Sequence, residues 1–135
     1  MVIKVGTHVI VEFEGCDPIL LKGVSFIQDA LYTAAKESNA TIVNQCFKQF
    51  DPWGVSGVIV IAESHISIHT WPEYGLASFD YFSCSESPKI EKAIEYLFKT
   101  LKATYMRKQT IDRGTTGVQL NEMSSNKGRG IEGLC

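Results

Sequence analysis

The sequence has no long apolar run and no excess of positive charge, and each absence excludes a class of protein. No stretch approaches the roughly 18 consecutive apolar residues that a membrane-spanning helix requires. Lys and Arg number 13 against 15 Asp and Glu, which argues against a nucleic-acid binder because such proteins carry a basic face. The first residues, Met1 to Gly6, lack the basic start and apolar block of a signal peptide. We therefore expect a cytoplasmic protein that binds neither membranes nor nucleic acid.

Pairs of cysteines close together in the sequence are also absent. The 4 cysteines are widely spaced and form no Cys-x-x-Cys motif, which is typical of reduced thiols and not of a disulfide framework or a zinc knuckle. Cys16, Cys46 and His8 suit structural positions, and Cys135 suits no particular role.

The length of 135 residues fits a single domain. We expect this domain to cover residues 1–120. From Asn121 to Cys135 the composition changes to Asn, Ser, Lys and Gly without periodicity, which predicts a flexible C-terminal tail.

The spacing of apolar residues predicts six strands and two helices. The strands are expected at residues 5–13, 41–50, 57–61, 66–70, 76–83 and 105–111. One helix should open at a capping box, Ser25-x-x-Gln28, and the other after an N-cap at Ser87. The order β-α-β-β-β-β-α-β predicts a two-layer α/β (α+β) sandwich, with an antiparallel or mixed sheet and both helices on one face. Because the other face would be uncovered, we expect a homodimer.

Most polar side chains suited to chemistry lie between residues 57 and 84. Glu63-Ser64-His65 separates two apolar stretches, and Ile66 and Ile68 alternate with polar residues as in a half-buried strand. A turn at residues 71–75 then leads to a strand that ends next to Cys84.

Three segments of the chain together resemble a known family. They are Ala62 to Gly75 with Asp80 and Cys84, Gly6-Thr7-His8 with Glu12-Phe13, and Phe50-x-Pro52-x-Gly54-Val55-Ser56-Gly57-Val58. These segments resemble the prokaryotic S-adenosylmethionine decarboxylase proenzymes, which cleave themselves at a Glu-Ser bond. The resemblance implies a pyruvoyl-dependent enzyme that decarboxylates S-adenosylmethionine for spermidine synthesis. Cleavage would give a β chain of residues 1–63 and an α chain of residues 64–135.

The resemblance also implies how the cofactor forms. The hydroxyl of Ser64 would attack the carbonyl of Glu63, and the serine would end as the pyruvoyl group. His69 would be the base of this processing reaction, and Ser56 would donate a hydrogen bond near the oxyanion.

The same resemblance assigns the residues for turnover. The pyruvoyl group at position 64 would form a Schiff base with the substrate amine and withdraw electrons as carbon dioxide leaves. Cys84 would then protonate the product carbon. The expected substrate-binding residues are Phe50, Trp71 and Glu73, and no metal is expected.

The spacing of Ser64 and His69 predicts that the active site is shared between chains. Residues five apart on a continuous strand point to opposite faces. A His69 that serves the Ser64 of its own chain would need a bulge in the strand. We favour the alternative, in which His69 and Ser56 serve the Ser64 of a neighbouring subunit in an (αβ)2 dimer.

Other interpretations remain open at this point. A zinc site at His65 and His69 is disfavoured, since residues four apart on a strand are separated by about 13 Å. A hydrolase built from Ser64, His69 and Asp80 lacks the Gly-x-Ser-x-Gly turn. The pyruvoyl chemistry could act on another amino acid, such as ornithine or arginine, and an unprocessed chain could be a non-catalytic α/β binding module.

Overall fold

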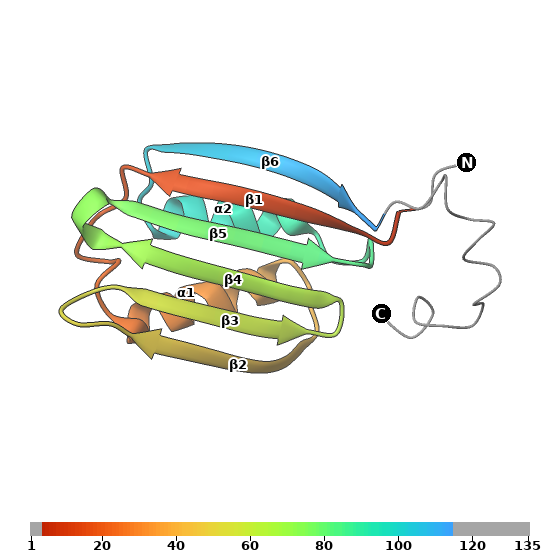
Figure 1. The fold of residues 1–135 in the computed structure, drawn as a ribbon, viewed down its shortest axis with the longest axis horizontal. Coiled ribbons are helices and arrows are strands. Elements are labelled where there is room, and N and C mark those ends of the chain that lie inside the picture. Colours follow the sequence, from red (N-terminus) through yellow and green to blue (C-terminus); the bar gives the residue numbers. More distant parts are fainter. Residues whose placement is uncertain (1–3, 115–135) are drawn as a thin grey trace.

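The computed structural model describes residues 4–114 as one antiparallel sheet with two helices on one face (Figure 1). The elements are β1 (Gly6–Glu14), α1 (Val24–Glu37), β2 (Ile42–Gln49), β3 (Val55–Ile61), β4 (Ser64–Trp71), the short 3-10 helix η1 (Pro72–Tyr74), β5 (Leu76–Ser83), α2 (Ile90–Thr100) and β6 (Tyr105–Arg113). The strand order in the sheet is β2-β3-β4-β5-β1-β6. The predicted class and order of elements are confirmed, whereas the expected tail from Asn121 lies outside the described residues. Within residues 4–114, neither helix has the length and apolar character needed to cross a bilayer.

The predicted start of α1 is wrong because a distant side chain replaces the local cap. The helix begins at Val24 with Gly23 as its N-cap, and no side chain caps it, so Ser25 lies inside the first turn. The amide of Val24 instead donates to Oε1 of Gln49, 2.7 Å away at the end of β2.

The predicted start of α2 is also wrong. The N-cap is Lys89, two residues beyond the expected Ser87, and it makes no side-chain cap hydrogen bond. The amide of Lys89 donates to the carbonyl of Ser38 at the end of α1, 2.8 Å away. Contact between the two helices therefore sets where α2 begins.

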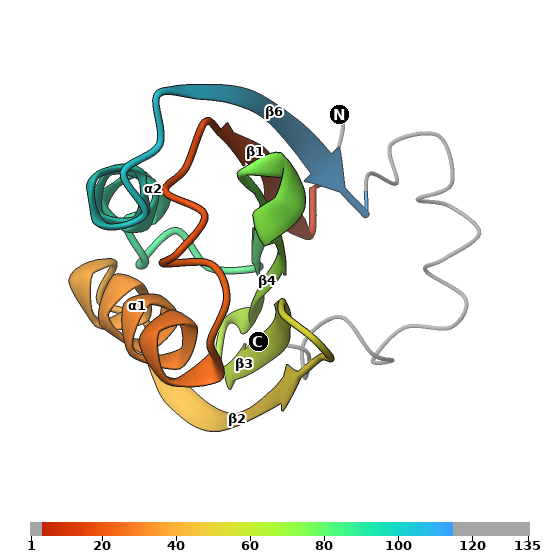
Figure 2. The same ribbon diagram turned by 90° about the vertical axis from the view of Figure 1, so that its left-hand side faces the viewer.

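Burial alternates along the central strands. The side chains that point to the helices form the core, among them Val11, Phe13, Ile59, Ile66, Ile68, Phe79, Tyr81, Ile27, Leu31, Ile94 and Leu97. Figure 2 shows both helices on one side of the sheet. We call the other side the open face; its central residues are His8, Ile10, Glu12, Ser56, Val58, His65, Ser67, His69, Ser78, Asp80 and Phe82.

The antiparallel pairing gives the sheet two distinct ends. Ser64 pairs with Ser83 at one end of β4, and Trp71 pairs with Leu76 at the other. In Figure 1 the turn between β3 and β4 lies at the right, and η1 lies at the left. We call these the Ser64 end (residues 62–64 and 83–84) and the Trp71 end (residues 50–54 and 71–75).

A buried threonine ties the Trp71 end together. Oγ1 of Thr70 accepts a hydrogen bond from the amide of Val55, 2.9 Å away, and donates to the carbonyl of Leu21 at 2.8 Å. The Thr70 residue is only 6% exposed. One hydroxyl therefore joins β4, β3 and the loop before α1.

Replacing this hydroxyl should destabilise the fold. We expect Thr70→Val, made in the uncleavable Ser64→Ala background, to lower the free energy of unfolding by about 2 kcal/mol, because a buried amide and carbonyl lose their partner. Thr110→Val on the exposed strand β6 is the matched control and should change it by less than about 0.5 kcal/mol. Equal effects of the two substitutions in urea unfolding would contradict this role of Thr70.

Candidate functional site

At the Ser64 end, Cys84 contacts one backbone carbonyl. Its amide donates to the carbonyl oxygen of Glu63 at 2.9 Å, and its Sγ lies 3.1 Å from the same oxygen. Cys84 is disulfide-bonded, so the expectation that all the cysteines are reduced is wrong for this residue. The carbonyl belongs to the peptide bond that precedes Ser64, and a donor on its oxygen stabilises the negative charge that develops there when a nucleophile attacks its carbon.

The backbone of Ser64 is strained. Its φ is 150°, in a region that residues with a Cβ rarely adopt and that costs about 1–3 kcal/mol. Pairing with Ile61 on β3 and with Ser83 on β5 holds it there. The peptide bond before Ser64 therefore combines backbone strain, a polarised carbonyl and an adjacent hydroxyl nucleophile.

Thr41 anchors the turn that carries this bond. Its amide and its hydroxyl lie 3.2 and 3.1 Å from the carboxylate of Glu63, and its carbonyl accepts from the amide of Ala62 at 2.8 Å. The sequence motif does not include Thr41, so only the fold reveals this contact.

At the Trp71 end, five of the predicted residues surround one cavity. Oγ of Ser56 and Nδ1 of His69 are 2.8 Å apart, because the two residues pair across β3 and β4. The cavity of about 290 Å³ is lined by Phe50, Trp53, Gly54, Val55, Ser56, His69, Thr70, Trp71 and Glu73. Aromatic rings and one carboxylate suit a ligand with a planar ring and hydroxyl groups.

Trp53 was not among the predicted site residues. It lies in the turn between β2 and β3, and Nζ of Lys22 lies 4.7 Å from the centroid of its ring. Its place beside the Pro52-x-Gly54 turn was visible in the sequence, but the sequence does not show that this turn faces Trp71.

The two groups of predicted residues are far apart within one chain. Ser64 and His69 are five residues apart on β4, which corresponds to about 16 Å at 3.3 Å per residue. Ser64, Glu63 and Cys84 lie at one end of the sheet, and Ser56, His69 and the cavity lie at the other. The chain by itself does not bring His69 to Ser64.

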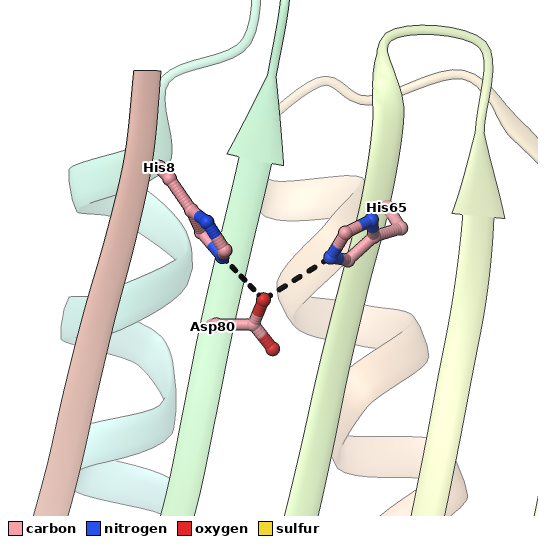
Figure 3. A group of neighbouring side chains, drawn as sticks. All are labelled: His8, His65 and Asp80. Carbon is pink, nitrogen blue, oxygen red and sulfur yellow. Dashed lines mark hydrogen bonds and ion pairs between the residues drawn. The ribbon is translucent and has the colours of Figure 1, made fainter. Parts of the chain in front are cut away.

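Asp80 lies between two histidines on the open face (Figure 3). Its Oδ2 is 2.5 Å from Nε2 of His8 and 3.1 Å from Nε2 of His65, and the hydroxyl of Ser67 donates to its Oδ1. The hydrolase triad, already disfavoured by the sequence, gains no support, since Asp80 hydrogen-bonds to His65 and, among the described residues, has no hydrogen bond to His69. His65 and His69 likewise do not converge as a zinc pair.

The hydrogen bonds to Asp80 change its ionisation. Burial raises the pKa of this carboxyl, but the hydrogen bonds from His65, Ser67 and His8 outweigh burial and lower the pKa from 3.8 to about 2. Asp80 is therefore a carboxylate at any pH near neutrality.

Comparison with known proteins shows which family this chain resembles in sequence and in fold. The chain matches the family model described as S-adenosylmethionine decarboxylase over residues 7–114. The S-adenosylmethionine decarboxylase proenzyme of Thermotoga petrophila is 48% identical over 111 residues, covering 82% of this chain and 85% of the relative. That of Pyrococcus horikoshii is 44% identical over 110 residues, covering 82% and 79%. The crystal structure of the adenosylmethionine decarboxylase from Aquifex aeolicus is similar, with a TM-score of 0.77 and 37% identity over 82% of this chain and 92% of that chain.

The lowered pKa of Asp80 predicts a pH-dependent contribution to stability. A carboxyl whose pKa is lower in the folded state stabilises the fold above its unfolded pKa, and this contribution is lost as the pH falls through the folded value. We expect the stability difference between Ser64→Ala and Ser64→Ala/Asp80→Asn to shrink by about 2 kcal/mol between about pH 5 and about pH 2. Asp112→Asn, at an exposed carboxylate, is the control. A difference that stays constant in denaturant titrations across this range would contradict the prediction.

Proposed function

The chain belongs to the S-adenosylmethionine decarboxylase family, and we propose that it matures by cleaving its own backbone between Glu63 and Ser64. It is an adenosylmethionine decarboxylase, and its product serves polyamine biosynthesis. Maturation would divide residues 1–135 into a β chain that ends at Glu63 and an α chain that begins at residue 64.

One observation carries the proposal: the carbonyl of Glu63 accepts a hydrogen bond from the amide of Cys84 directly before a strained Ser64. An ordinary turn does not need a strained serine. Together the hydrogen bond and the strain lower the barrier for attack by the Ser64 hydroxyl on the carbon of the preceding carbonyl.

The bond changes of maturation follow from the residues present. Oγ of Ser64 attacks the carbonyl carbon of Glu63, the amide nitrogen leaves and takes a proton, and an ester forms. A base removes the Cα proton of residue 64, and the bond between Cβ and Oγ breaks. This releases the main-chain carboxylate of Glu63, which becomes the C-terminus of the β chain. Water then replaces the nitrogen of the resulting enamine as ammonia, which leaves a pyruvoyl group at residue 64.

The site residues fit such a group. A pyruvoyl group withdraws electrons from an amino acid bound to it and so assists the loss of carbon dioxide. Sγ of Cys84 is 3.1 Å from the carbonyl oxygen of the residue before Ser64. This position supports Cys84 as the donor of a proton to the product once its disulfide is reduced. Phe50 and Trp71 would stack on the adenine ring, and Glu73 would accept hydrogen bonds from the ribose hydroxyls.

The separation of the two ends supports an active site shared by two chains. A second copy would cover the open face about a two-fold axis that lies in the interface and runs across the strands. Because this operation exchanges the ends of the sheet, His69 and Ser56 of one copy would approach Ser64 of the other. His69 would then act as the base of maturation, and Ser56, whose Oγ lies 2.8 Å from Nδ1 of His69, would donate a hydrogen bond near the oxyanion.

Intact mass spectrometry tests the proposed cleavage. After incubation at neutral pH we expect two fragments whose summed mass exceeds that of the precursor by about 1 Da, because ammonia is lost and water is gained. Plain hydrolysis of the same bond would instead add about 18 Da, which separates a protease contaminant from maturation. Ser64→Ala should remain one chain of 15.0 kDa.

A wild-type chain that stays intact under these conditions would favour the non-catalytic binding module. Ser85→Ala is a suitable control at the same end of the sheet, since its hydroxyl contacts only the amide of Ser87 among the described residues. It should cleave at the wild-type rate.

Mixing two inactive variants tests the shared site. Neither Ser64→Ala nor His69→Ala should cleave alone, because one lacks the nucleophile and the other lacks the base. When the two are co-expressed, hybrid dimers should contain one complete site, and the His69→Ala chain should be cleaved. Cleavage of His69→Ala alone at the wild-type rate, or no cleavage in the mixture despite proven hybrid dimers, would contradict the shared site.

A further inference from the structure

The group of His8, His65 and Asp80 has no part in the chemistry described so far. Its members come from three strands, β1, β4 and β5 (Figure 3). His8 and His65 both pair with Phe82 in the sheet, one from each side, and both rings pack on the ring of Phe82 at centroid distances of 5.3 and 5.8 Å. The cross-strand register therefore directs two imidazoles to one carboxylate.

Arg113 determines the proton positions in this group. Its guanidinium lies 2.7 Å from Nδ1 of His8 and stacks 5.0 Å from the centroid of Phe82. A guanidinium only donates hydrogen bonds, so Nδ1 of His8 accepts. The proton of a neutral His8 is then on Nε2, which donates to Asp80.

The same contact argues against a metal ion at this place. The ligand atoms of His8, His65 and Asp80 lie within 4.8 Å of one another, a separation that a metal could bridge. A metal at Nε2 of His8 would move the ring proton to Nδ1, where it would face the donors of Arg113. The arrangement instead fits a carboxylate that receives three hydrogen bonds.

His65 links this group to the reactive residue. It follows Ser64 directly, so its amide nitrogen would carry the pyruvoyl group after cleavage. Before cleavage the backbone holds Ser64 from both sides. Afterwards the connection to Glu63 is lost, and chain ends are mobile unless other contacts hold them.

We propose that Asp80 is a positioning residue, which acts through His65 to hold the start of the α chain and its pyruvoyl group in place for decarboxylation. His8 and Arg113 fix Asp80 from the other side. The inference rests on the proposed cleavage at Ser64. It assigns Asp80 to turnover by the cleaved enzyme, because before cleavage the intact backbone on both sides already holds Ser64 in place.

A double-mutant cycle on the cleaved enzyme tests this role. Asp80→Asn removes the charge, and His65→Phe keeps a ring but removes the donor. We expect each to lower kcat per cleaved chain by between about 10- and 100-fold, with KM for S-adenosylmethionine changed less than about 3-fold. The double variant should be no slower than the slower single variant, since both substitutions remove the same contact. The rate of cleavage should change less than kcat.

Several results would overturn the proposal. They are a wild-type kcat in Asp80→Asn, losses that multiply in the double variant, or a kcat that falls on chelation and returns with Zn²⁺. All assays are made below the melting temperature of the least stable variant and are normalised by mass spectrometry to the cleaved fraction. Asp112→Asn, which loses an exposed carboxylate, should keep the wild-type kcat. If the wild-type chain does not cleave, the proposed function itself fails. If Asp80→Asn cleaves and keeps the wild-type kcat, only the role proposed for Asp80 fails.

Discussion

The register of β4 between β3 and β5 decides which side chains of this protein meet. It pairs Ser64 with Ser83, so that Cys84 follows next to the Glu63 carbonyl, and it pairs Ser56 with His69 at the other end. A shift of one residue would turn every side chain of β4 to the opposite face. Ile66 and Ile68 are fully buried, and they make such a shift too costly.

Much of the fold was predictable because burial follows a simple alternation. The predicted bounds of β5 match the observed strand, and the open face follows from the polar residues that alternate with Ile66 and Ile68. Helix starts were not predictable. Their amides bind Gln49 and Ser38, which are distant in sequence, so the local cap motifs carried no information.

The candidate site was predictable as a set of residue types but not as an arrangement. The motif identifies Ser64 and Cys84, yet it cannot show that the backbone amide of Cys84 donates to the Glu63 carbonyl. Backbone donors carry no signature in a sequence. His8 suited a structural position on its own, and its contact with Asp80 depends on the register of three strands.

The two ends that cleavage would create are held by different anchors. The carboxylate of Glu63 binds Thr41 within the future β chain, whereas His65 in the future α chain binds Asp80, which also binds His8 of the β chain. Two strand pairs, β1–β5 and β3–β4, also join the future β chain to the future α chain. The proposed cleavage at Ser64 would therefore break a bond inside a hydrogen-bonded sheet, so that it would relieve local strain while the pairings that set the geometry of the site remain in place.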